Sequence, residues 1–165
     1  MLDFLSAHGL TIVLLGVGAT LLMDAWAWLQ LRLFQAPSLN YAFVGRWLGH
    51  LSQGKLRHHP IMAATPIPYE RPLGWCAHYA IGVLFAGLHL WFFGAAWLMQ
   101  PSLLPAFASG VVSMAAPFLI LQPCFGFGLA AAKTPKPWVA RGKSLVAHLA
   151  FGFGLYLTAW LWHAF

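Results

Sequence analysis

Four long apolar runs divide the chain, at about residues 10–34, 73–98, 103–132 and 144–162. Each is about as long as, or longer than, the ~20 residues that a helix needs to cross the hydrocarbon core of a bilayer. Only 7% of the residues are charged, against about 25% in soluble domains, so the chain cannot surround a core with a water-exposed surface. We therefore predict an all-α integral membrane protein with four transmembrane helices, in which residues 1–165 form a single membrane domain.

The positions of the Lys and Arg residues predict the orientation of these helices. They lie at or between the first two runs and at or between the last two, and nowhere else: Arg32, Arg46, Lys55, Arg57 and Arg71, then Lys133, Lys136, Arg141 and Lys143. Cytoplasmic loops of membrane proteins carry an excess of Lys and Arg. Both basic loops are therefore expected in the cytoplasm, and both termini on the opposite side of the membrane.

Two segments are expected to depart from straight spanning helices. Across residues 39–53 one half of a helical wheel is apolar and the other half is polar: Leu39, Phe43, Val44, Trp47, Leu48 and Leu51 against Arg46, Gly49, Ser52 and Gln53. This pattern is typical of a short amphipathic helix in the membrane interface. In the third run, Pro117 and Pro123 remove backbone donors, which predicts a kinked helix.

A repeated sequence links the second and fourth runs. Residues 71–82 (RPLGWCAHYAIG) and 141–152 (RGKSLVAHLAFG) share Arg, Ala, His, Ala and Gly in register. A weaker echo joins the Gly-Val pairs at residues 16–17 and 110–111. One explanation is chance similarity between apolar helices. The other is duplication of a two-span unit, which predicts a parallel 2+2 repeat with its pseudo-twofold axis along the membrane normal.

Each run also carries one polar or reactive side chain at a similar depth, namely Asp24, His78, Cys124 and His148. At 1.5 Å per helical residue, each lies about 10–13 Å from a basic residue at the cytoplasmic end of its run. Ionisable groups are costly against lipid, so we expect these side chains to face the interior of the bundle. If the duplication is real, His78 and His148 are symmetry mates at equal depth.

Four roles fit Asp24, His78 and His148. Two imidazoles and a carboxylate are a ligand set for a divalent metal ion such as Zn²⁺ or Fe²⁺, with Cys124 as a weaker candidate because free Cys usually behaves as a small apolar residue. The two histidines alone suit a bis-axial haem. A carboxylate beside an imidazole also makes a proton relay. The fourth role is structural, with Asp24 hydrogen-bonded to an imidazole so that two helices are held together.

Other polar features carry less information about function. The pair His58 and His59 lies in the basic loop with His50 and Glu70, and we expect this pair to be solvated, with metal binding as the alternative. The sequence contains no P-loop, dinucleotide fingerprint, GxSxG elbow or HExxH motif, so it shows no apparatus for nucleophilic hydrolysis. These observations leave open whether the chain is an enzyme.

Four short segments carry a resemblance to a known family: Gly18–Asp24 (GATLLMD), Gly45–Trp47 (GRW), Gly74–Tyr79 (GWCAHY) and Ser144–His148 (SLVAH). They are similar to segments of a bacterial family of small four-span membrane proteins that is known only as a domain of unknown function. The resemblance covers nearly the whole chain. It implies a location in the inner membrane of a Gram-negative bacterium, and it implies no activity, substrate, cofactor or ligand residue.

Three functions are therefore open. The first is binding of a cation, either a metal ion or protons, at Asp24, His78 and His148, with transport across the membrane by a homo-oligomer. The second is a redox protein that holds haem or metal between His78 and His148. The third is a non-catalytic accessory or assembly subunit of a membrane complex. The expected partner is the lipid bilayer and not nucleic acid, because membrane topology accounts for the net charge of +6.

Overall fold

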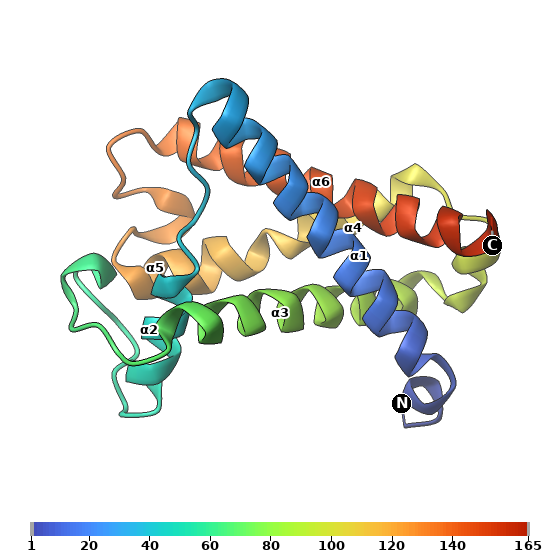
Figure 1. The fold of residues 1–165 in the computed structure, drawn as a ribbon, viewed down its shortest axis with the longest axis horizontal. Helices are drawn as coiled ribbons and strands as arrows, with labels where there is room; N and C mark the ends of the chain where they lie inside the picture. The colour runs from blue at the N-terminus through green and yellow to red at the C-terminus, as the bar shows by residue number, and fades with distance from the viewer. Residues whose placement is uncertain (1, 165) are drawn as a thin grey trace. The chain divides into compact units, whose positions relative to one another are not determined.

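The computed structural model of the chain describes residues 2–164, and every regular element within that range is a helix. Figure 1 shows the elements in chain order: α1 (Leu2–Phe34), α2 (Ala42–Leu51), η1 (Ile61–Ala63), α3 (Glu70–Phe93), η2 (Ala95–Met99), α4 (Leu103–Ser113), η3 (Ala116–Leu121), α5 (Gln122–Phe125), η4 (Leu129–Ala131) and α6 (Pro137–Ala164). The elements η1, η2 and η4 are 3₁₀-helices, and η3 is a π-helix. The predicted all-α class is confirmed.

Four described stretches are long and apolar enough to cross a membrane: Ala7–Phe34, Glu70–Phe93, Leu103–Phe125 and Pro137–Trp162. They match the four predicted runs except at their ends. The second stretch ends before the predicted boundary because Gly94 adopts φ +81° and ψ 151°, a positive-φ conformation that is not helical and that glycine adopts readily. The third stretch ends early for the same reason, since Gly126 adopts φ +89°. Together the four stretches fit a multi-pass membrane protein.

The third stretch is not one regular α-helix, as its two prolines predict. The α4 helix ends at Ser113, and the chain continues through the π-helix η3 into α5. Pro117 has no N–H to donate to the carbonyl of Ser113, four residues before it. The next amide restores the ladder, because Phe118 N donates to the Met114 carbonyl at 3.0 Å. The span is therefore irregular around Pro117, where the sequence predicts a kink.

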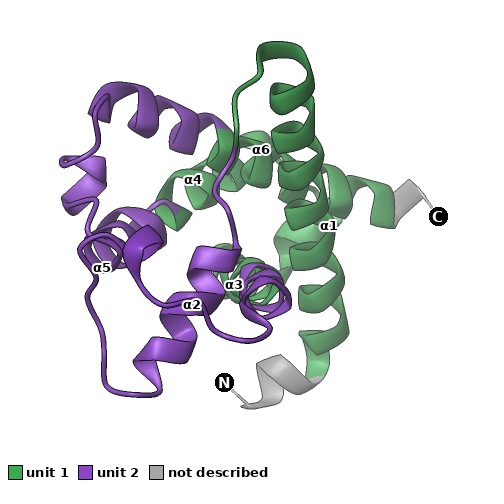
Figure 2. Cartoon of the chain, turned by 60° about the vertical axis from the view of Figure 1, so that its left-hand side comes forward, with its two compact units in different colours: residues 1–37, 79–113, 147–165 green, residues 38–78, 114–146 purple. Residues whose placement is uncertain are grey.

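The chain forms two compact units, coloured separately in Figure 2. Unit 1 consists of Met1–Pro37, Tyr79–Ser113 and Ala147–Phe165, and unit 2 of Ser38–His78 and Met114–Val146. Unit 1 thus contains α1, α4 and most of α3 and α6. Unit 2 contains α2, the irregular half of the third span, and the first residues of α3 and α6.

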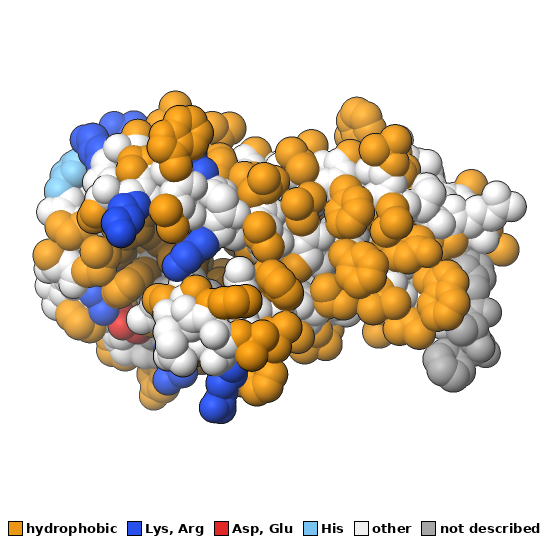
Figure 3. All heavy atoms as spheres, turned by 90° about the horizontal axis from the view of Figure 1, so that it is seen from above, with side chains coloured by type: hydrophobic (Ala, Val, Ile, Leu, Met, Phe, Trp, Pro, Cys, Tyr) orange, Lys and Arg blue, Asp and Glu red, His pale blue; other side chains and the backbone are white. Residues whose placement is uncertain are grey.

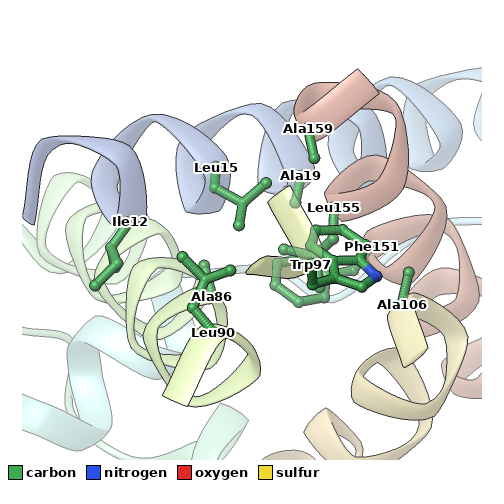
Figure 4. Close-up of a cluster of buried hydrophobic side chains, with 10 residues drawn as sticks. All are labelled: Ile12, Leu15, Ala19, Ala86, Leu90, Trp97, Ala106, Phe151, Leu155 and Ala159. Carbon is green, nitrogen blue, oxygen red and sulfur yellow. The ribbon is translucent and has the colours of Figure 1, made fainter. Parts of the chain in front are cut away.

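The core of unit 1 is built from small, branched and aromatic side chains on four helices and η2, as the close-up in Figure 4 shows: Ile12, Leu15, Ala19, Ala86, Leu90, Trp97, Ala106, Phe151, Leu155 and Ala159. Glycines allow the helices to approach closely. A Cβ at Gly16 of α1 would lie 2.5 Å from the Cα of Val83 in α3, and one at Gly152 of α6 would lie 2.7 Å from the Ala106 carbonyl in α4. Small residues at such crossings are typical of helices packed in a membrane.

The core of unit 2 joins α2 to α5 and η1 through Val44, Trp47, Ile61, Cys124 and Phe125. The α2 helix lies within the predicted range of residues 39–53, but the burial of its side chains does not follow the two halves of the wheel throughout. Arg46, assigned to the polar half, is buried, and Leu51, assigned to the apolar half, is 39% exposed. The physical reason is that α2 packs against the start of α3, which supplies a charged partner for Arg46.

Large hydrophobic side chains cover much of the outer surface, as the face in Figure 3 shows. In unit 1 the examples include Leu10, Phe92 and Leu104, which are 72%, 79% and 81% exposed. Contiguous apolar surface of this kind is rare on soluble proteins. It suits contact with lipid acyl chains, as the composition predicts.

Candidate functional site

Asp24 contacts α3 within unit 1. The hydroxyl of Tyr79 donates a hydrogen bond to Asp24 Oδ2 at 2.9 Å. One helical turn before Asp24, the buried Thr20 donates to the carbonyl of Gly16 at 2.7 Å, and its hydroxyl lies against Gly82 of α3. Residues 16, 20 and 24 therefore share the face of α1 that packs on α3. Asp24 lies within a span, as the sequence predicts, and a phenol is one of its partners.

His148 contacts α4, also within unit 1. Its Nδ1 lies 2.7 Å from the hydroxyl of Ser113, which is buried. The same hydroxyl lies 2.7 Å from the carbonyl of Gly110. A carbonyl can only accept, so Ser113 donates to Gly110 and accepts from His148 Nδ1–H. In a neutral imidazole that donates from Nδ1, the lone pair is on Nε2.

His78 belongs to unit 2 and lies among aromatic rings. Its imidazole stacks on Tyr41, with ring centroids 4.1 Å apart, and meets the edge of Trp75 at 5.8 Å. Cys124, the weaker candidate ligand, is buried in the apolar core of unit 2. Within the part of the chain that the structure describes, no three His, Cys, Asp or Glu side chains are grouped so as to hold a metal ion.

A second polar cluster lies in unit 2, and sequence reasoning missed its centre. Arg46 of α2 donates from Nε and Nη2 to the two oxygens of Glu70, each at 2.8 Å. Its Nη1 also donates to the carbonyls of Ile61, Met62 and Ala64, at 3.3, 3.4 and 3.0 Å. The hydrogen bonds to Glu70 raise the pKa of Arg46 above its ordinary value. The sequence contained one indication that Glu70 has a structural role, because Glu70 is one of only three acidic residues in the chain.

The same cluster contains His50 and His58, and the expectation that His58 is solvated is wrong. His50 and His58 are buried, and His50 Nδ1 lies 2.8 Å from His58 Nε2. The loop after α2 folds back over the helix, because Trp47 Nε1 donates to the Leu56 carbonyl at 2.9 Å and His58 N donates to the Cys124 carbonyl at 2.8 Å. Only His59 is exposed, as expected.

The burial of His58 is expected to make stability depend on pH. Burial is the main cause that lowers the pKa of His58 below its ordinary value of 6.5, and the charges of His50 and Lys55 add to it. The folded chain therefore binds fewer protons than the unfolded chain around and below pH 6.5. Stability is expected to fall as the pH drops through this range, by at most about 1.4 kcal/mol per pH unit for one proton.

Replacement of His58 by glutamine should remove this dependence. Thermal unfolding of the detergent-solubilised protein between pH 5 and pH 8 measures the slope for the wild type and for His58→Gln. The exposed neighbour provides the control, since His59→Gln should keep the wild-type slope. An unchanged slope in His58→Gln would show that another group governs acid stability.

Comparison with known proteins is consistent with this architecture. The family model described as "Protein of unknown function (DUF2938)" matches residues 13–162. The chain belongs to this family. The DUF2938 match includes the Asp24–Tyr79, Ser113–His148 and Arg46–Glu70 contacts, and it confirms the resemblance to a domain of unknown function. No curated protein and no solved structure matches the chain.

Proposed function

We propose that this DUF2938 protein binds a cation inside the membrane, that the cation is a proton, and that its uptake and release accompany transport across the bilayer. The observation that carries the proposal is the 2.9 Å hydrogen bond from Tyr79 to Asp24 within the helical spans of unit 1. An ionisable group in a span is costly and is usually associated with ion or proton pathways. A phenol that donates a hydrogen bond to the carboxylate lowers this cost.

The partners of the candidate residues favour a proton over a metal ion. The contacts of Asp24 and His148 include the hydroxyl groups of Tyr79 and Ser113, which can donate or accept as the protonation state of their partner changes. No three-ligand group for a metal occurs among the described residues.

Two matching helix contacts in unit 1 support the proposed duplication. Gly16 of α1 approaches Gly82 of α3, and Gly110 of α4 approaches Gly152 of α6. The repeat aligns Gly16 with Gly110 and Gly82 with Gly152. In both contacts a hydroxyl one turn further along the first helix donates to the glycine carbonyl at 2.7 Å. We propose that α1–α3 and α4–α6 are copies of one two-helix unit.

The location that we propose is the inner membrane of a bacterium, with both termini on the periplasmic side. Its support is the distribution of charge, because eight of the nine Lys and Arg residues lie in unit 2. The ninth, Arg32, lies in the last turn of α1, just before unit 2 begins. The positive-inside rule places such residues on the cytoplasmic side.

Proton flux into liposomes that contain the purified protein tests the function. An imposed pH gradient, followed with a trapped pH-sensitive dye, should relax faster with the wild type than in empty liposomes. Asp24→Asn should lower the protein-dependent rate at least tenfold, because the amide keeps the shape and an acceptor but cannot titrate. Tyr79→Phe should also lower the protein-dependent rate, because Asp24 loses the hydroxyl group that donates to it.

Controls separate this function from the alternatives. Cys76→Ser changes an exposed side chain of α3 and should leave the rate unchanged. Equal flux and equal thermal stability in Asp24→Asn and the wild type would overturn the proposal and leave Asp24 with a packing role in an accessory subunit. A stoichiometric metal ion or a haem absorbance band that is lost in the Asn variant would overturn the assignment to protons.

A further inference from the structure

Unit 2 carries a large excess of positive charge. It contains eight Lys and Arg residues and a single acidic residue, Glu70. Arg46 already binds both oxygens of that carboxylate. The other seven basic residues therefore have no carboxylate within the unit to balance them. An anionic partner from outside the chain would supply the missing charge.

One of these residues, Arg141 near the start of α6, has a side chain that two contacts hold in place. Its Nε donates to the carbonyl of Ala130 at 2.8 Å, and its guanidinium carbon lies 4.5 Å from the centre of the Trp138 ring. The side chain is thus held from two sides, while its Nη groups make no hydrogen bond within the described chain. A planar guanidinium that is fixed in this way matches the oxygens of a phosphate.

Exposed apolar side chains and exposed lysines both lie near Arg141 in the sequence. Trp138, Val139 and Leu129 are 79%, 53% and 61% exposed. Lys133, Lys136 and Lys143 are exposed on the same short stretch of chain. Exposed tryptophans of membrane proteins lie at the level of the lipid headgroups. Figure 3 shows Lys and Arg side chains beside hydrophobic ones on the surface.

We propose that Trp138, Arg141, Lys133, Lys136 and Lys143 form a headgroup surface that binds an anionic phospholipid, with Arg141 on the phosphodiester. The lysines contribute charge attraction, and Trp138 inserts beside the acyl chains. The exposed apolar side chains favour a lipid over a free phosphate or a nucleic acid, because only a lipid provides hydrocarbon next to the phosphate. The pair formed by Trp28 and Arg32 in unit 1, at 5.5 Å, repeats the combination of an exposed tryptophan with an arginine.

Lipid retention by the intact protein tests the proposal. Native mass spectrometry of the full chain in a neutral detergent is titrated with phosphatidylglycerol and, separately, with phosphatidylcholine of the same acyl chains. Phosphatidylglycerol should bind at least tenfold more tightly. Arg141→Gln should weaken its binding about fivefold, the expected effect of one basic residue near an anionic surface, and should leave phosphatidylcholine unaffected. The control is Arg57→Gln, which removes an exposed cation from another part of unit 2 and should change binding less than twofold.

A second variant keeps the test valid if Arg141→Gln disturbs the fold. The double variant Lys136→Gln/Lys143→Gln alters two exposed side chains and should weaken phosphatidylglycerol binding by more than the single control does. Equal affinity for the two lipids would overturn the proposal, as would equal losses in Arg141→Gln and Arg57→Gln. Displacement of phosphatidylglycerol by millimolar inorganic phosphate would also overturn it and indicate a site for free phosphate.

Discussion

Arg46→Met is expected to lower the free energy of unfolding by about 3 kcal/mol, which is the low end of the range for breaking a buried ion pair. The substitution leaves Glu70, whose side chain is 18% exposed, as a largely buried carboxylate without its bidentate partner. It also removes the donor that binds three carbonyls between Ile61 and Ala64. Thermal or denaturant-induced unfolding in detergent, followed by circular dichroism, measures the loss.

Two further variants define the origin of this effect. Arg71→Met makes the same change at an exposed position and should alter stability by no more than about 0.5 kcal/mol. The double variant Arg46→Met/Glu70→Leu removes both charges, so it should recover part of the stability. The part of the free energy of unfolding that the double variant does not recover reflects the three carbonyls that have lost their donor. If Arg46→Met is as stable as the wild type, the ion pair between Arg46 and Glu70 does not stabilise unit 2.

Gly45→Ala is expected to be nearly as damaging, at up to about 3 kcal/mol. Gly45 of α2 and Gly74 of α3 form a close crossing in which each helix lies against the backbone of the other. A Cβ at Gly45 would overlap the carbonyl of Glu70, and one at Gly74 would overlap the carbonyl of Tyr41. Backbone atoms of packed helices cannot move aside as a flexible side chain can, so the helices must separate. The measurement is the same unfolding experiment.

The matched control for this prediction is Gly142→Ala in α6. No atom lies within 4 Å of a Cβ built at Gly142, and its φ is not positive. Alanine should therefore stabilise the helix there, by about 0.5–1 kcal/mol. Opposite signs for the two Gly→Ala changes are expected. A loss of similar size at both positions would show that glycine flexibility, rather than the close crossing, explains the effect.

The spans could be predicted from the sequence because their signal is local. Length and hydropathy identify each helix without reference to its neighbours, and Pro117 disturbs its span through its own missing N–H. The ends of the spans were less accurate. Gly94 and Gly126 end their helices inside runs that continue to be apolar, and hydropathy does not report a positive φ.

The contacts of the candidate residues were harder to predict. Helical periodicity puts Gly16, Thr20 and Asp24 on one face of α1, but it cannot name Tyr79 as a partner. For α2 it placed Arg46 on a polar face, because a helical wheel treats the helix as if it were alone. The charge is buried only because the start of α3 brings Glu70 to it.

The sequence by itself determined the helical class, the four apolar stretches and the concentration of basic residues in the segments between them. These properties follow from composition and from short-range periodicity, which act within one helix. Only the tertiary structure decided that His50 and His58 share a hydrogen bond, that Ser113 orients His148, and that Arg141 is held against Trp138 and Ala130. Arg141 and Ala130 are only eleven positions apart in the sequence. Their contact nevertheless depends on the turn between them, whose backbone conformation cannot be predicted from hydrophobic periodicity. A side chain's partner is set by how helices and turns pack, and packing depends on the whole chain at once.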